Sequence, residues 1–336
     1  MAVAAGGEGR GGAGATPAPA GLTAARRAHS RLRAVAEQLF HGTALACAVF
    51  VLVAMTAILL ELFHHSRVSL ARFGWGFLTS VAWNPVTREF GAASSIFGTI
   101  VSTVIALLLA IPLALVIAMF LVEVAHPRVA RPVGYGIELL AAVPSIIYGM
   151  WGLFVLAPVL AEHVQPRLQA IVGGLPLFSG PPMGIGVFTA GIVLALMVLP
   201  FITAVMRDIF TLVPPVLKES GYGMGATTWE VTRKVTMRHG MRGMVGGVFL
   251  GLGRALGETM AVTFVIGNDH RIAASLFASG NTISSTLANE FTEASEPVYL
   301  SALVELGLIL FVVTLLVQIA AQMWLRRLKR RLGADL

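Results

Sequence analysis

The chain has 336 residues, of which 56% are hydrophobic and only 12% are charged. A soluble protein carries about 25% charged residues, so this composition excludes an ordinary soluble domain and indicates a polytopic membrane protein. The net charge of +7 does not indicate nucleic-acid binding, because the basic residues cluster at the ends of apolar runs, where they orient membrane helices. The single cysteine, Cys47, excludes an internal disulfide and a cysteine-based zinc site.

The first 38 residues predict a disordered, basic tail. Residues 1–24 are mostly Gly, Ala and Pro, which bury too little apolar surface to offset the entropy of ordering. The run Thr43–Phe63 is too long for a signal peptide and lacks a small-residue cleavage site. We therefore expect residues 39–94 to hold a retained first span and an external, interfacial segment rich in aromatic residues.

Five further apolar runs are long enough to cross about 30 Å of hydrocarbon. The expected fold is therefore all-α, with about six transmembrane helices. These five runs cover approximately Ile96–Val122, Ile137–Leu160, Ile185–Met206, Gly243–Ile266 and Tyr299–Trp324. We expect one transmembrane domain over 95–325, followed by a short basic tail over 326–336.

The distribution of basic residues predicts the orientation. Eighteen of the 24 Lys and Arg residues lie on the side of the N-terminus, five lie on the opposite side, and Arg254 lies within a span. Because cytoplasmic loops carry the excess of Lys and Arg, both termini are expected in the cytoplasm. The basic, amphipathic segment 207–242 is then cytoplasmic, and the acidic segment 267–298 is external.

The run Gly243–Ile266 carries two opposite charges, Arg254 and Glu258. Their i, i+4 spacing predicts an ion pair on one helix face. Charges inside a membrane are expensive, so this helix is expected to face protein or a water path. Small residues recur every four positions and predict close packing against other helices; they are Gly243, Gly247, Gly251, Gly253 and Gly257.

The motifs of several enzyme classes are missing from the sequence. There is no G-x-x-x-x-G-K-[ST] loop for nucleotide phosphates and no H-E-x-x-H zinc motif. The adjacent serines at 94–95 and 284–285 have no His or Asp partner nearby in the sequence. We therefore expect no catalytic residue, no metal site and no cofactor bound by this chain.

The segment 218–230 resembles the coupling segment of ABC importer permeases, the binding-protein-dependent transport permeases. Glu219, Ser220 and Gly221 take the place of the family's E-A-A, and Gly225 follows in register. Arg238 stands where the family usually has proline. The resemblance implies a type I (MetI-like) transmembrane fold. It also implies a short helix that docks in a cleft of a cytoplasmic ATPase, with contacts from Glu219, Ser220, Gly221, Gly225 and Ala226.

Three further stretches resemble the permeases of phosphate-specific (Pst) importers: residues 142–152, 246–263 and 281–294. This resemblance implies transport of inorganic phosphate across a bacterial inner (plasma) membrane. The implied partners are a companion permease (PstA) in a heterodimer, two copies of an ATPase (PstB) and an extracytoplasmic phosphate-binding protein (PstS). ATP and Mg would be used by the ATPase, and none of this chain's residues is expected to bind them.

The candidate site residues follow from the spans and the resemblance. Arg254, Glu258 and Glu305 are intramembrane charges, and we predict that they line the translocation pathway. For Arg254 the alternative is a purely structural ion pair, and for Glu305 it is a capped polar contact. Asn289 and Glu290 are expected at an external gate or in contact with the binding protein, with a plain polar loop as the alternative.

Other functions stay open at this point. An importer permease for sulfate or molybdate would need much the same chemistry. A membrane scaffold that senses phosphate without transporting it, or a passive channel, would not need a coupling segment, so the 218–230 stretch argues against both.

Overall fold

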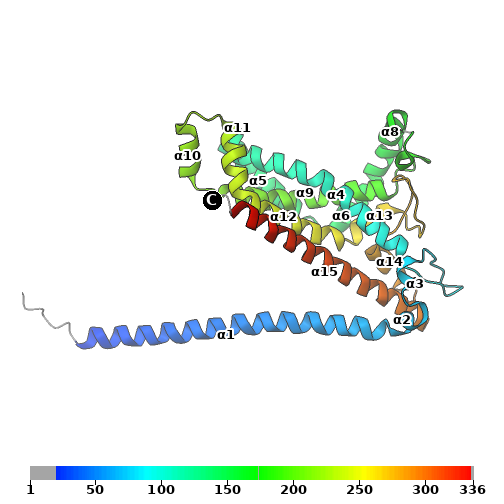
Figure 1. Cartoon of the computed structure of the whole chain (residues 1–336), viewed down its shortest axis with the longest axis horizontal. Coiled ribbons are helices and arrows are strands. Elements are labelled where there is room, and N and C mark those ends of the chain that lie inside the picture. The colour runs from blue at the N-terminus through cyan, green and yellow to red at the C-terminus, as the bar shows by residue number, and fades with distance from the viewer. Residues whose placement is uncertain (1–19, 173, 334–336) are drawn as a thin grey trace, which may run out of the picture. The chain divides into compact units, whose positions relative to one another are not determined.

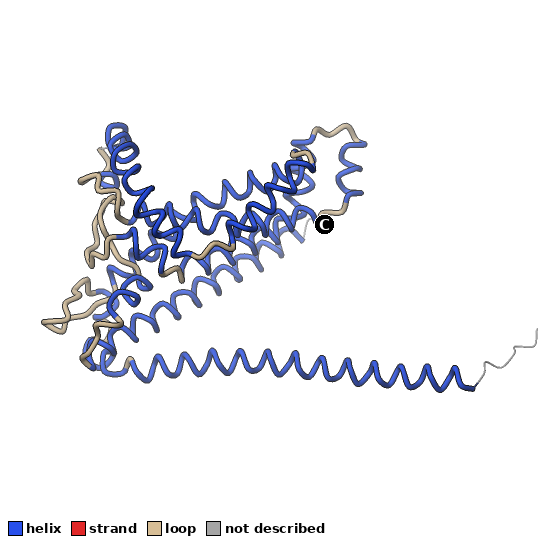
Figure 2. Tube along the Cα trace, turned by 180° about the vertical axis from the view of Figure 1, so that it is seen from behind, coloured by secondary structure: helices blue, strands red, loops and turns tan. Residues whose placement is uncertain are grey.

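The computed structural model describes residues 20–172 and 174–333, and within them every regular element is a helix (Figure 2). The expected all-α class is confirmed. The chain divides into two compact units, one ending at Ile58 and one beginning at Leu59. The packing described below lies within the second unit.

The bounds of the helices are as follows. In chain order the α-helices are α1 (Ala20–His65), α2 (Arg67–Phe73), α3 (Gly76–Thr79), α4 (Ala93–Met119), α5 (Pro127–Ala141), α6 (Ser145–Trp151), α7 (Ala157–Val159), α8 (Gln165–Val172), α9 (Val187–Thr211), α10 (Pro215–Gly223), α11 (Thr228–Val231), α12 (Met237–Leu256), α13 (Met260–Ile266), α14 (Ile283–Glu290) and α15 (Pro297–Gly333). Tighter or wider turns join some of them, namely the π-helical turns η1 (Phe120–Val124), η2 (Gly152–Leu156), η3 (Leu160–Val164) and η5 (Thr232–Thr236) and the 3₁₀ turn η4 (Pro176–Phe178).

About six spans are confirmed by length and composition. Five helical segments of the described chain qualify singly: Glu37–His65, Ala93–Val124, Ser145–Val172, Val187–Thr211 and Pro297–Arg327. A sixth qualifies as a bent pair, Thr228–Leu256 with Met260–Ile266. Of the expected tails, residues 1–19 lie outside the described part. Helix α1 begins at residue 20, and α15 continues to Gly333.

The third span differs from the prediction of Ile137–Leu160. Helix α5 ends at Ala141, and the spanning helix begins at Ser145, after Pro144. The reason is that proline has no N–H to donate and disfavours a helical conformation in the residue before it. The span then continues through two π-helical turns to Val172, beyond the predicted end.

Two hydrophobic cores hold the second unit together. In the larger core, α4 and α9 run side by side (Figure 1), and a stripe of alanines on α4 lets the two backbones approach closely. This stripe consists of Ala106, Ala110, Ala114 and Ala118, all 0% exposed. The smaller core joins Phe77 and Phe90 to Leu303 and Leu306 of α15.

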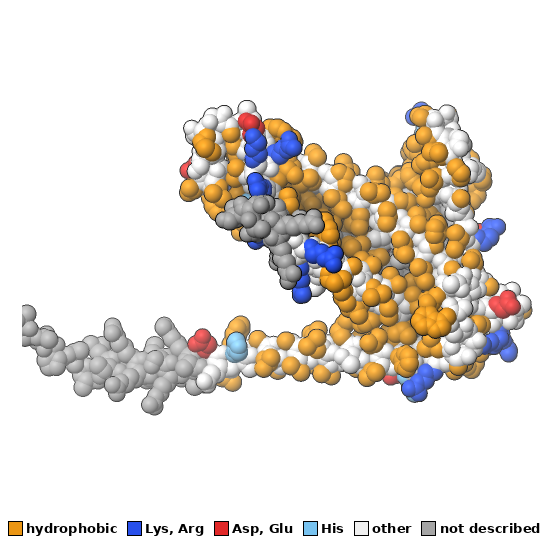
Figure 3. Space-filling model, in the orientation of Figure 1, with side chains coloured by type: hydrophobic (Ala, Val, Ile, Leu, Met, Phe, Trp, Pro, Cys, Tyr) orange, Lys and Arg blue, Asp and Glu red, His pale blue; other side chains and the backbone are white. Residues whose placement is uncertain are grey.

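The outer surface fits a membrane. Hydrophobic side chains cover the visible face of the spanning helices, while Lys and Arg side chains gather around α10 and α11 at one end (Figure 3). Leu108 of α4 and Phe154 of η2, for example, are about 70% exposed in the isolated chain. Such side chains need lipid or another protein around them.

Candidate functional site

The bent span carries the charges that the sequence singled out. Helix α12 ends at Leu256, α13 begins at Met260, and the two axes differ in direction by 60°. Gly257 lies at the break, where its low helix propensity favours termination. The Glu258 carboxylate accepts a hydrogen bond from the backbone N–H of Ala261 at 3.2 Å and so caps the first turn of α13. The run is therefore two helices rather than one.

The predicted ion pair between Arg254 and Glu258 is not formed. An i, i+4 pair requires the helix to continue through both positions, and α12 ends between them. The Arg254 guanidinium instead lies over the ring of Phe201 on α9, 5.9 Å from its centroid. Within the described residues no carboxylate reaches salt-bridge distance of Arg254, which is exposed in the isolated chain.

The glycines of α12 divide between two neighbours. A Cβ at Gly243, Gly247 or Gly251 would meet side chains of α9 at 2.7–2.8 Å, so this stripe lies against α9. A Cβ at Gly253 would meet the Gln318 amide of α15 instead, at 2.6 Å. Gly257 packs against no neighbouring helix and lies at the break between α12 and α13. The close approach of α12 to α9 is what holds Arg254 beside Phe201.

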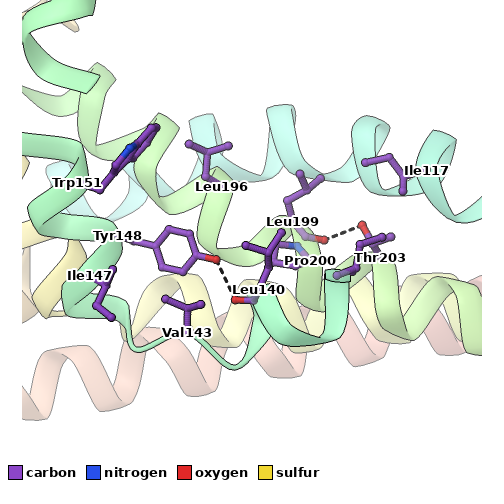
Figure 4. Close-up of a pocket in the computed structure, with 11 residues that line it drawn as sticks. Ile117, Leu140, Val143, Ile147, Tyr148, Trp151, Leu196, Leu199, Pro200 and Thr203 are labelled. Carbon is purple, nitrogen blue, oxygen red and sulfur yellow. Dashed lines mark hydrogen bonds between the residues drawn. The ribbon is translucent and has the colours of Figure 1, made fainter. Parts of the chain in front are cut away.

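An apolar cavity of about 530 Å³ lies between α5, α6 and α9 (Figure 4). Its two hydroxyls are engaged: Tyr148 donates to the Leu140 carbonyl at 2.8 Å, and Thr203 donates to the Leu199 carbonyl at 2.7 Å. Its lining holds no charged group, so the cavity is poorly suited to an anion.

The segment 207–242 is more helical than a loop. Helix α10 exposes Glu219 and Ser220 and buries Gly221 against Val231, whose Cγ2 would lie 3.0 Å from an added Cβ. Gly225 adopts φ +83°, a left-handed conformation that side chains disfavour, and the Ala226 N–H then bonds back to the Gly221 carbonyl at 3.1 Å. These contacts fold the segment into a compact helix–turn–helix.

One residue at this end was not predicted from the sequence. Glu123, in the turn η1 that closes α4, has a side chain only 4% exposed. Its Oε1 accepts hydrogen bonds from Lys218 Nζ of α10 at 2.7 Å and from Thr236 Oγ1 of η5 at 2.8 Å. The only signal in the sequence is an acid at the end of an apolar run, since its partners lie 95 and 113 positions away.

At the opposite end, Glu290 lies in a cluster of hydrogen-bond donors. Its carboxylate accepts from Trp83 Nε1, from Tyr299 OH at 2.8 Å and from His270 Nε2 at 3.0 Å. Burial raises the pKa of Glu290, but these three hydrogen bonds outweigh it and hold the pKa below the ordinary value. Asn289, its neighbour, is half-buried. We call Trp83, His270, Glu290 and Tyr299 the Glu290 cluster.

The Glu290 cluster extends inward through Asn281. The Asn281 amide reaches His270 Nδ1 at 2.9 Å and Ser95 Oγ of α4 at 2.7 Å, while the imidazole stacks on the Trp83 ring with centroids 5.2 Å apart. Trp83, 207 positions away, therefore meets His270 and Tyr299 at one carboxylate, and these contacts hold the predicted gate residue Glu290 in place.

Glu305 is placed apart from Arg254. It is 3% exposed and lies in the smaller core near Ser69 of α2. Within the described chain its Oε2 and the Ser69 hydroxyl have no hydrogen-bond partner. Its place in the translocation pathway stays a prediction.

Comparison with known proteins places these features in a wider group. A family model described as "Binding-protein-dependent transport system inner membrane component" matches residues 90–330. The "Phosphate transport system permease protein PstC" of Mesorhizobium japonicum is 53% identical over 317 residues, 93% of this chain and 97% of that protein. The protein of the same name from Haemophilus influenzae is 50% identical over 88% of this chain and 95% of its own length.

A solved structure supports the same fold. A chain of a bacterial alginate ABC transporter, crystallised with an alginate-bound periplasmic protein, aligns with a TM-score of 0.57 over 86% of this chain and 94% of its own length. The sequence identity is 16%, so the likeness is one of fold alone.

Proposed function

Because the chain belongs to the binding-protein-dependent transport system inner membrane components, with their type I (MetI-like) fold, we propose that it is the permease subunit of an ATP-driven importer of inorganic phosphate. The proposal that the substrate is phosphate rests on the 53% identity, over nearly the whole chain, to a phosphate transport system permease. Sulfate and molybdate are the competing oxyanions.

The proposed assembly supplies what this chain lacks. It comprises a companion permease (PstA), two ATPase subunits (PstB) that use ATP and Mg, and an extracytoplasmic phosphate-binding protein (PstS). Helices α10 and α11 and the turn between them present Val216, Met224 and Trp229 outward, each more than 60% exposed. Such an apolar surface on a basic segment suits a protein partner rather than water. We assign this surface to the ATPase, with Glu219 and Ser220 at its edge.

The orientation follows from the basic residues. They concentrate at the α10 end and in the two terminal segments, so these parts are cytoplasmic in the proposed inner-membrane topology. The Glu290 cluster then lies at the extracytoplasmic end, where the binding protein delivers phosphate. Movement of α10 when the ATPase pair closes would switch the spans between outward-open and inward-open states.

Arg254 is the residue that we propose to meet the anion. Its guanidinium lies beside the helix break and has no carboxylate partner in the described chain, and an arginine binds phosphate with two parallel hydrogen bonds. Glu258, which caps α13, positions the break rather than neutralising Arg254. Passing phosphate would supply the missing negative charge for part of each cycle.

The experiment is uptake of labelled phosphate by proteoliposomes that contain the whole transporter. Arg254→Gln should lower the uptake rate by roughly ten-fold or more, since a hydrogen bond to a charged group contributes about 1.5–3 kcal/mol. Arg242→Gln, an exposed arginine on the same helix, is the matched control and should transport at the parental rate.

The same vesicles test the substrate. Excess unlabelled phosphate should abolish the signal, while excess sulfate or molybdate should leave it unchanged. If Arg254→Gln takes up phosphate at the parental rate, Arg254 does not line the pathway. If sulfate competes with labelled phosphate, the proposed substrate changes to another oxyanion.

A further inference from the structure

The buried carboxylate of Glu123 joins three parts of the chain that are otherwise separate. Glu123 ends α4, Lys218 belongs to α10, and Thr236 belongs to the turn η5 that leads into α12. All three side chains are mostly or fully buried: the Glu123 side chain is 4% exposed, the Lys218 side chain 19%, and Thr236 is 0% exposed. One oxygen, Oε1, accepts both hydrogen bonds.

Helix α10 has few other attachments to the spanning helices. Its buried face packs through Gly221 on Val231, which belongs to the same helix–turn–helix. Its other face is exposed and apolar. The bond from Lys218 to Glu123 is therefore the specific polar link from α10 to a helix that crosses the membrane.

We infer that Glu123 is the positioning residue through which displacement of α10 reaches α4 during transport, an inference that rests on the function proposed above. If α10 moved alone, the Glu123 carboxylate would lose its counter-charge in an apolar environment, which is strongly unfavourable. Moving α10, η1 and η5 together keeps the bonds intact. The carboxylate thus makes the joint motion the favoured one.

The path from Glu123 into the membrane is short. The π-helical turn η1 adds a residue to the last turn of α4, and such turns often occur at functional positions. From there α4 packs along α9 through its alanine stripe, and α9 packs against the glycines of α12. A push on η1 is therefore transmitted to the helices that hold Arg254 and Phe201.

A second Glu–Lys pair in the same region provides the control. Glu230 and Lys234 lie 3.2 Å apart at i, i+4, but their side chains are 43% and 72% exposed and both belong to one helical stretch. This pair links no separate elements. It has the same charges as the Glu123–Lys218 pair without the burial or the span between elements.

The test measures phosphate uptake and ATP hydrolysis in the same proteoliposomes of the complete transporter. Glu123→Gln should assemble and hydrolyse ATP, but the phosphate transported per ATP hydrolysed should fall at least five-fold. Lys218→Gln, which keeps the carboxylate and its bond to Thr236, should show the same loss if Glu123→Gln assembles poorly. Lys234→Gln, which breaks the exposed control pair but leaves Glu230 in its capping box with Thr227, should keep the parental ratio.

Exchange of the two charges sharpens the result. The double variant Glu123→Lys with Lys218→Glu should recover part of the lost ratio, which a loss of general stability would not explain. A parental ratio in assembled Glu123→Gln and Lys218→Gln complexes would overturn the inference while leaving the proposed function intact. Absence of phosphate uptake by the parental complex would instead overturn the proposed function.

Discussion

Each end of the second unit holds one carboxylate through hydrogen bonds from several side chains, Glu290 at one end and Glu123 at the other, and the two are held differently. Glu290 accepts hydrogen bonds from Trp83, Tyr299 and His270, side chains with rigid rings, and the rings of Trp83 and His270 stack on each other. Glu123 is held by the flexible Lys218 and by a hydroxyl. Aromatic side chains have only two rotatable bonds and therefore fix the geometry of the hydrogen bonds that they donate. The flexible lysine side chain can keep its hydrogen bond while its partner moves.

This difference indicates that the two ends differ in rigidity. In the proposed orientation, the Glu290 cluster fixes the extracytoplasmic loops to the start of α4 through Asn281 and Ser95. At the opposite end, the role inferred for Glu123 requires α10 and the end of α4 to move together. We therefore expect the end of the proposed transporter that holds the Glu290 cluster to be rigid and the α10 end to move. The following substitutions test that contrast.

The largest effect is expected where α4 contacts the backbone of Asn281, beside the Glu290 cluster. A Cβ at Gly98 of α4 would collide with the carbonyl oxygen of Asn281, which has no side-chain freedom to retreat. Gly98→Val should therefore cost more than the roughly 1–3 kcal/mol typical of overpacking and should abolish assembly. The yield of purified complex measures this, with Gly136→Ala, which meets no atom within 4 Å, as the control.

The next effect concerns the charge of Glu290. Glu290→Gln should lower the free energy of unfolding by about 1.5–3 kcal/mol at neutral pH, because hydrogen bonds to a carboxylate are stronger than those to an amide. The pKa of Glu290 is lowered on folding, so its contribution is present above the ordinary value of 4.5 and is lost as the pH falls through the folded-state pKa.

Thermal unfolding of the purified complex against pH checks this prediction. The difference between the parent and Glu290→Gln should shrink below pH 4.5. His270 and Tyr299 are the titratable groups in contact with Glu290. The exposed Glu293 provides the control, since Glu293→Gln should show no such convergence. A difference that stays constant with pH would contradict the role of the charge.

A smaller effect is expected where the glycines of α12 pack against α9. Gly247→Ala brings a Cβ within 2.8 Å of Val205 Cγ1, a side-chain atom that can shift, so a loss of about 1 kcal/mol is expected. Gly246, its neighbour, meets nothing within 4 Å in this chain, and Gly246→Ala should be neutral or stabilising by roughly 0.5–1 kcal/mol. Equal melting temperatures for the two variants would argue against the α12–α9 packing.

The smallest effect is expected in the turn after α10. Gly225→Ala has open space in this chain but must keep φ +83°, which costs about 1 kcal/mol for a residue with a Cβ. The apparent affinity for the ATPase should fall by about five-fold. Gly223→Ala, which also meets no atom within 4 Å and has no positive φ, should bind as the parent does.

The number of spans followed from the sequence because apolar length is a local property. The break between α12 and α13 did not, since Gly257 and Glu258 also fit the continuous helical pattern that placed Arg254 beside Glu258. Pro144 was compatible with a kink inside the predicted span Ile137–Leu160, so the proline alone did not predict that α5 ends at Ala141.

The site was predicted unevenly for the same reason. Glu219 to Gly225 was identified from spacing along the chain, whereas the roles of Glu123 and Glu290 depend on partners from distant segments. Pairing across 95 or 207 positions leaves no local pattern in one sequence. Only the fold brings those groups within hydrogen-bonding distance.

The break at residues 257–259 has a consequence for the life of the chain before assembly. Residues 257–259 lie between the two helices, and Gly257 is exposed in the isolated chain. Lipid cannot satisfy backbone groups at such a break, so another subunit or water must cover it. If the proposed companion permease covers this break, a copy made without it would leave those backbone groups facing lipid and would be less stable in the bilayer, so its abundance would follow the supply of that partner.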